Sequence, residues 1–178
     1  VLIFFSSKTK ADNFLCNSDN FNNFIENNNI QSIDIIVNDI RQWQVNYLHA
    51  FEKISMTQGD IDQHFKKKFI ANVKVLYEND FECTFPAKIR ISGDQRDHLG
   101  ISSTHEPPPV GITSLDIELL KGNINSVVKF KLFIPFTKGG DNEVFSTALL
   151  SELGFLAPKT FYVSTVLNGQ KTIYLFQE

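Results

Sequence analysis

DNEVFSTALLSELGFLAPKTFYVSTVLNGQKTIYLFQE, residues 141–178, is the stretch with the clearest structural signals in the chain. It predicts a short helix that opens at Asn142 and stops at Gly154, followed by two strands. Asn168 and Gly169 separate those strands, and this pair readily adopts the positive φ angles of a type I′ turn. The C-terminal part of the chain is therefore expected to form a helix followed by a β-hairpin.

Two further strand pairs are expected before this stretch. Residues 69–77 alternate apolar and polar side chains, and residues 81–92 return after a turn, which predicts a long hairpin. Residues 113–120 and 127–136 predict a second strand pair, joined around Gly122. A loop of about a dozen residues, typical of functional or mobile segments, separates the two pairs.

The N-terminal part predicts a strand and an amphipathic helix. Residues 33–37 are rich in β-branched side chains, which favours a strand. Residues 40–54 place their apolar side chains on one face of a 3.6-residue period, so we expect Trp43 to pack against the β-rich part. We accordingly divide the chain into an N-terminal extension, residues 1–64, and a β-rich domain, residues 65–178.

Composition indicates a globular domain and excludes some partners. The 178 residues are 42% apolar and 21% charged, with a formal net charge of −3, so nothing points to nucleic acid or an anionic membrane. Cys16 and Cys83 are the only cysteines, and two free thiols are favoured over a disulfide. No Cys-x-x-Cys pair is present, which excludes a structural zinc site of that kind.

The first five residues, VLIFF, leave the compartment open. Five apolar residues are too few to span a bilayer. They fit the end of a signal peptide or membrane anchor, which would make the protein exported or membrane-anchored. They also fit a short β-strand of a cytoplasmic protein.

Several short motifs in the second half resemble the CotH-type spore-coat kinase family of atypical protein kinases. That family has an Asn-Glu-headed helix, an LG-x-x-AP segment, an NG turn and a final Tyr-Leu-x-x-Glu strand. The matching positions here are Asn142-Glu143, Leu153 to Pro158, Asn168-Gly169 and Tyr174 to Glu178. The resemblance covers residues 87–178, about half of the chain.

The resemblance implies an α+β fold: an antiparallel, β-rich, kinase-like small lobe with one regulatory-type helix, preceded by a strand–helix extension. It also implies that the chain stops where the family crosses to its large lobe, which would be the missing intramolecular partner. The full-length parent would use ATP and Mg²⁺ to phosphorylate a protein or a surface polymer. The catalytic carboxylates of the family belong to the large lobe, so this chain alone is expected to be inactive and to hold no catalytic residue.

The same resemblance assigns candidate nucleotide-binding residues. Gly93 and Asp94 end a segment similar to the family's K-x-R-x-x-G-[ND] loop. Kinases hold the phosphates with a lysine on a central strand, and Lys129 and Lys131, at alternate positions of one strand, both face the same side of it. Glu143 would pair with one of them. The residues alone equally fit a turn for the first pair and a solvated strand face for the lysines. At the helix start they fit a cap from Asp141 or Asn142, with Glu143 complementing the helix dipole.

Two departures from the family pattern favour other functions. Asp116 stands where the family has a second lysine, and Asp141 stands where it has an arginine before Asn-Glu. Both departures suit a pseudokinase. The remaining alternative is a non-catalytic binding or structural module of the cell envelope, docking to another domain or to a cell-surface glycan.

Two further groups of residues are expected to have no functional role. Asp94, Asp97, His98 and His105 lack a fixed ligand spacing, so no metal site is expected. The run of lysines 66–68 ahead of a strand is expected to be a solvated edge.

Overall fold

The structure is a computed structural model, and it describes Cys16 and residues 29–57, 59–78, 80–102 and 104–178. Residues 1–5 and their two alternatives therefore lie outside the described part. None of the helices in the described part is both long and apolar enough to cross a membrane.

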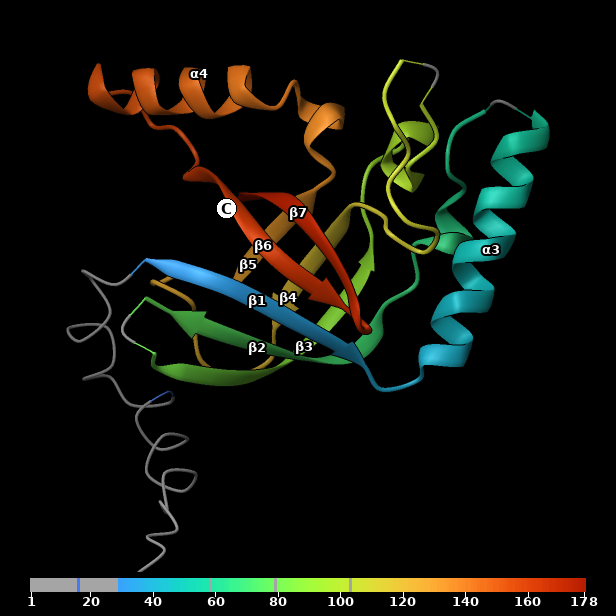
Figure 1. Cartoon of the computed structure of the whole chain (residues 1–178), viewed down its shortest axis with the longest axis horizontal. Helices are drawn as coiled ribbons and strands as arrows, with labels where there is room; N and C mark the ends of the chain where they lie inside the picture. Colours follow the sequence, from blue (N-terminus) through green and yellow to red (C-terminus); the bar gives the residue numbers. More distant parts are fainter. Residues whose placement is uncertain (1–15, 17–28, 58, 79, 103) are drawn as a thin grey trace, which may run out of the picture.

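Seven strands form a closed barrel, in the order β1-β2-β3-β4-β5-β7-β6 (Figure 1). All neighbours are antiparallel except β1 and β6, which run parallel. The strands are β1 (Ile30–Val37), β2 (Phe69–Tyr77), β3 (Glu82–Ile91), β4 (Leu115–Leu119), β5 (Lys129–Phe133), β6 (Thr160–Leu167) and β7 (Gln170–Gln177). Closure leaves no sheet edge between these strands, so their ladder groups are paired all round.

The barrel interior is filled by apolar side chains. Every second residue of each long strand points inward, as the two-residue period of a strand requires. Val73 of β2, Ile89 of β3 and Leu132 of β5 are among those that are fully buried. The interior is therefore a packed core rather than a ligand cavity.

The hairpin turn expected at Asn168-Gly169 is confirmed and also seals the barrel. Both residues have positive φ, 50° and 88°. The Asn168 side-chain oxygen accepts a hydrogen bond of 2.9 Å from the Val37 N–H, and the Asn168 N–H donates one of 2.8 Å to the Ile35 carbonyl. The turn between β6 and β7 is thus tied to β1, on the other side of the closure.

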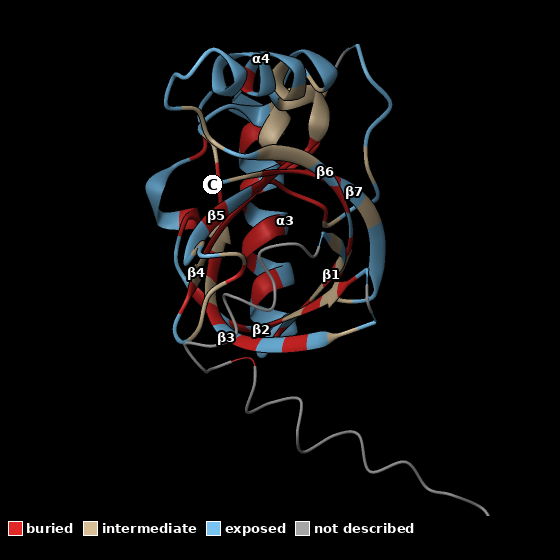
Figure 2. Ribbon diagram, turned by 90° about the vertical axis from the view of Figure 1, so that its left-hand side faces the viewer, coloured by how far each residue is buried: buried red, intermediate tan, exposed pale blue. Residues whose placement is uncertain are grey.

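Helix α3 (Ile40–Thr57) covers one end of the barrel and confirms the predicted amphipathic helix. In Figure 2 it is seen through the ring of strands. Asp39 accepts a 2.9 Å hydrogen bond from the Gln42 N–H and caps the first turn. The predicted burial of Trp43 is also confirmed, since it is 2% exposed and meets Phe69 edge to face at 5.3 Å.

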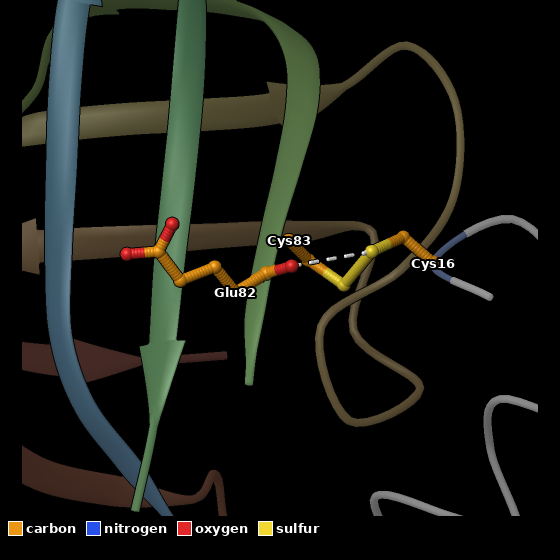
Figure 3. Close-up of a disulfide and its surroundings, with 3 residues drawn as sticks. All are labelled: Cys16, Glu82 and Cys83. Atoms are coloured by element: carbon orange, nitrogen blue, oxygen red, sulfur yellow. Dashed lines mark hydrogen bonds between the residues drawn. A yellow bond between two sulfur atoms is a disulfide. The ribbon is translucent and has the colours of Figure 1, made fainter. Parts of the chain in front are cut away.

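A disulfide joins Cys16 to Cys83 at the opposite end of the barrel, so the prediction of two free thiols is wrong (Figure 3). Cys83 is an inward-facing residue at the start of β3, and Cys16 is buried. The two are 67 residues apart in sequence, and no spacing rule could have paired them. The bond fastens the N-terminal part of the chain to the barrel.

The predicted fold class, a kinase-like α+β small lobe, is wrong. The described part of the chain is mostly β, with two α-helices, α3 and α4 (Asp141–Glu152), and three short 3₁₀ turns: η1 (Gln63–Phe65), η2 (Arg96–Leu99) and η3 (Pro135–Lys138). The strands were expected close to their observed positions, but their closure was not. β1, which the sequence places before the boundary at residue 64, fills the gap between β2 and β6 and turns an open sheet into a barrel.

Candidate functional site

A basic face covers the outer side of β3, β4 and β5. Outward residues of these strands line up in two cross-strand rows, in each of which a carboxylate lies between two cations. One row is Arg90, Asp116 and Lys131; the other is Lys88, Glu118 and Lys129. With Lys66, Lys68 and Asp94, which approach from the flanking loops, the basic face holds six cations and three carboxylates.

Arg90 and Asp116 form the fixed centre of the basic face. The guanidinium donates two hydrogen bonds to one Asp116 oxygen, from Nε at 2.9 Å and from Nη2 at 2.6 Å. The Asp116 side chain is only 5% exposed, whereas that of Arg90 is 36% exposed. A buried carboxylate needs such a partner because desolvating it alone is costly. Asp116, the departure from the family pattern, is therefore part of an ion pair.

Lys66 and Asp94 form a second ion pair at the edge of the basic face. The hydrogen bond from Lys66, and then its charge, hold the pKa of the Asp94 carboxyl below its usual value. The Lys66 side chain is only 7% exposed. The expectation of a solvated edge at lysines 66–68 is therefore wrong for Lys66. Lys68 is half-exposed and pairs with Glu118, whose pKa it lowers by a hydrogen bond.

Lys88, Lys129 and Lys131 have no carboxylate within 4 Å in the described part of the chain. Lys131 lies 5.8 Å from the centre of the Phe133 ring, which holds its ammonium group without neutralising it. These three cations remain available for an anionic ligand.

Two adjoining cavities open on the basic face. One, of about 240 Å³, is lined by Gly93, Asp94 and Lys131, three of the five residues proposed from the family resemblance. Lys129 lines the other, of about 160 Å³. Arg90 and Asp116 border both cavities. The structure thus gathers four of the five sequence-predicted residues on one face.

Position 93 requires a glycine because the His98 ring packs against it. The φ of Gly93 is +84°, and a Cβ atom at this position would lie 2.0 Å from the His98 ring. The turn interpretation accounts for this glycine without any ligand. The His98 ring is anchored in turn by Ser114, with 3.0 Å between Nδ1 and Oγ.

Glu143 does not join the basic face. Its carboxylate accepts a 2.7 Å hydrogen bond from the Gln177 side-chain amide and forms no ion pair in the described part of the chain. Gln177 is the cross-strand neighbour of Lys131 on β7 and β5, so Glu143 bonds the neighbour of the expected lysine and not the lysine itself. The expected cap from Asp141 or Asn142 is also wrong, because Gly140 is the N-cap and no described side chain caps the helix. Asp141 instead accepts a 2.7 Å hydrogen bond from Tyr162, and Glu143 lies in the first turn, where a negative charge complements the helix dipole.

The other groups of polar residues in the described part of the chain are less suited to catalysis or ligand binding. Ser114, His98 and Asp97 are in contact, but Ser114 is fully buried and its Oγ also accepts the Ile134 N–H, so it cannot reach a substrate. Among the described residues, no group of three or more His, Cys, Asp or Glu is placed to hold a metal ion. His105 stacks on Phe136 at 5.0 Å, beside a separate cavity of about 400 Å³.

Comparison with known proteins leaves the family open. No protein-family model matches the chain, and no curated protein matches it.

Sequence reasoning missed Lys66 and Arg90, which border the larger cavity of the basic face. Lys88 and Arg90 alternate with inward apolar residues, and this signal marks an outward cationic strand. No sequence signal could place that strand beside Lys131, since register between distant strands is set by the closed sheet.

Proposed function

We propose that this chain is a non-catalytic binding module whose basic face holds an acidic polysaccharide. The observation that carries the proposal is the group of three unpaired lysines, Lys88, Lys129 and Lys131, around the fixed Arg90–Asp116 pair. The ion pair keeps the guanidinium in place, while the lysines retain free charge for sulfate or carboxylate groups.

The shape of the basic face favours a chain-like ligand over a single compact one. Each cavity is smaller than the 300–1,000 Å³ or so of a usual small-molecule pocket. The two cavities adjoin, and outward cations on one strand recur about every 7 Å. A polymer with repeated negative groups can contact both cavities at once, which raises affinity without a deep pocket.

The composition of the basic face argues against nucleic acid and against a nucleotide. Single-stranded nucleic acid is held by aromatic side chains on which bases stack. In the part of the chain that the structure describes, the outward aromatic residue of this face is Phe133, and it is 3% exposed. A nucleotide base would also need an apolar slot, whereas charged and polar side chains dominate both cavities.

The disulfide supports the polysaccharide assignment. Disulfides persist in oxidising environments, which include the cell surface and the periplasm. The Cys16–Cys83 bond therefore favours an exported protein, in the compartment where acidic glycans are found.

Phosphoryl transfer, as in the CotH-type kinases, is the second candidate function. In its favour, Gly93, Asp94 and Lys131 line one cavity. Against it, Glu143 bonds Gln177 instead of a lysine. This candidate therefore depends on the sequence resemblance and on a catalytic carboxylate from outside this chain.

Isothermal titration calorimetry with a heparin-derived hexasaccharide tests the polysaccharide proposal, with neutral maltohexaose and Mg-ATP as comparison ligands. We expect binding of the acidic hexasaccharide alone, weakening as salt screens the charges. Lys129→Ala/Lys131→Ala should weaken it about tenfold, or 1.4 kcal/mol. Lys171→Ala, which removes an exposed lysine from β7, should leave it unchanged.

Two results would contradict the proposal. Equal binding by the double variant and the wild type would place the ligand elsewhere. Micromolar binding of Mg-ATP, lost in the double variant, would favour the kinase candidate instead.

A further inference from the structure

Helix α4 carries its largest apolar side chains on the face that points away from the barrel. Phe145, Leu149 and Leu153 recur every four residues and so form one stripe along the helix. All three are exposed, Phe145 by 69% and Leu153 by 63%. Figure 1 shows α4 outside the barrel, and Figure 2 colours it mostly as exposed. An ordinary surface helix has the opposite arrangement.

The barrel-facing side of α4 is made of small side chains. Thr147, about 200° round the helix from Phe145, is the buried residue of α4, and its hydroxyl donates to the Glu143 carbonyl at 2.9 Å. A cavity of about 800 Å³ between α4 and the strands is lined on the helix side by Thr147, Ala148 and Ser151. The helix therefore gains little apolar burial from its own barrel.

The exposed stripe continues beyond the helix. The six large apolar residues of this surface, here called the α4 stripe, are Phe145, Leu149, Leu150, Leu153, Phe155 and Leu156. With roughly 200 Å² for a fully exposed side chain of this size, the α4 stripe presents on the order of 750 Å². That is close to the roughly 800 Å² per partner of a standard specific interface.

We propose that the α4 stripe is the interface of a homodimer, in which two α4 helices pack antiparallel about a two-fold axis at Leu149. This arrangement places Phe145 of one protomer opposite Leu153 of the other. A two-fold interface uses the same patch on both subunits, and one stripe centred on Leu149 meets that condition.

The charges of α4 permit this pairing. Asp141 and Glu143 are held at the barrel side by Tyr162 and Gln177, away from the stripe. Glu152 lies beside the stripe, and in the antiparallel pair its two copies are separated along the axis by about 9 Å, the rise of six residues. Salt screens most of the repulsion between exposed charges at that distance.

Sedimentation equilibrium over a range of protein concentrations tests the dimer. We expect the wild type to be dimeric and Leu149→Asp/Leu153→Asp to dissociate at least tenfold more readily. The two carboxylates introduced at position 149 would meet at the dry two-fold axis, and each carboxylate introduced at position 153 would face the Phe145 ring of the other protomer. The matched control is Ile173→Asp, which changes an exposed apolar residue of β7. This control should dimerise as the wild type does.

A monomeric wild type at every concentration would overturn the proposal, since another polypeptide would then have to cover the stripe. Dimers that persist equally in the double variant would overturn it as well. Circular dichroism checks that the double variant is folded. Because the substituted side chains point away from the barrel, we expect its spectrum to match that of the wild type.

Discussion

His98 links the loop after β3 to the strand that follows it. Its ring lies over Gly93, its Nδ1 lies 3.0 Å from the Ser114 Oγ, and its carbonyl accepts a 2.8 Å hydrogen bond from the Ser114 N–H. A glycine is needed beneath the ring because any side chain there would occupy the same space. Substituting this glycine and a second, unhindered one separates the free-energy cost of a positive φ angle from the cost of a clash with the His98 ring.

Gly93→Ala should destabilise the fold more than Gly154→Ala. Both glycines have φ near +80°, so each substitution costs about 1–2 kcal/mol of backbone strain. Only the alanine at position 93 would collide with His98, since nothing lies within 4 Å of a Cβ at position 154. Urea unfolding should show Gly93→Ala to be worse by about 1–3 kcal/mol. Equal losses would show that the His98 ring does not lie over Gly93.

Acid should weaken the fold through His98. Burial lowers the pKa of His98; Asp97 and Asp94 oppose this shift, and Lys138 and Lys66 add to it. With the folded pKa below the unfolded value of about 6.5, the unfolded chain binds the extra proton first, and stability is lost as the pH falls below 6.5 through the folded pKa. The loss from this group should reach at most about 1.4 kcal/mol per pH unit.

Urea unfolding at several pH values checks this dependence, with His98→Gln as the comparison. The difference between the two proteins should shrink as the pH falls from 7.5 to 5. A constant difference would mean that His98 titrates normally.

At the scale of elements, the strands lie close to where the sequence predicts them, whereas the two helices differ in how they pack against the barrel. The periodicity of helix α3 predicted its position and the burial of Trp43 at the end of the barrel. Ile40, Leu48 and Phe51 of the predicted apolar face are nevertheless exposed. Helix α4 has the predicted ends, and Gly154 stops it with a φ of +80°. Which side of α4 faces the barrel could not be predicted from the sequence. An apolar stripe on a helix normally packs against its own chain, whereas this one is exposed.

Amide hydrogen exchange should show that α4 is less stable than the strands of the barrel. In the Leu149→Asp/Leu153→Asp variant, we expect the amides of α4 to exchange far faster than those of β2 and β3, because the helix buries one residue against the barrel. Mass spectrometry after short labelling times measures both. Protection of α4 equal to that of β2 would show that the helix is held by the barrel itself.

At the scale of the whole molecule, barrel closure is what sequence reasoning could not supply. The alternation in residues 69–77 predicts a strand, but β1 pairs with β6 across more than a hundred residues. Local patterns carry no information on such a distant pairing. The same limit explains why Lys129 and Lys131 were expected beside Glu143, whereas the closed sheet places Lys129 beside Glu118 and Lys131 beside Asp116.

Reducing the disulfide should lower stability without abolishing the fold. The bond closes a loop across 67 residues, which corresponds to about 4 kcal/mol in the chain-entropy account. Fluorescence of Trp43, the only tryptophan, reports unfolding because this residue is buried against Phe69. Urea curves with and without reductant should differ for the wild type and coincide for Cys16→Ser/Cys83→Ser. A wild type indifferent to reductant would mean that the bond does not form.

Chemical-shift mapping by NMR, with the acidic hexasaccharide titrated into ¹⁵N-labelled protein, tests the central claim most directly. The claim is that the outer side of β3, β4 and β5 is the binding surface of a closed barrel. The account predicts saturable shifts at the amides of Arg90, Asp116, Lys129 and Lys131, with α3 and β1 unchanged. Shifts confined to α3 or α4, or no shifts at a ligand concentration that calorimetry finds saturating, would contradict it.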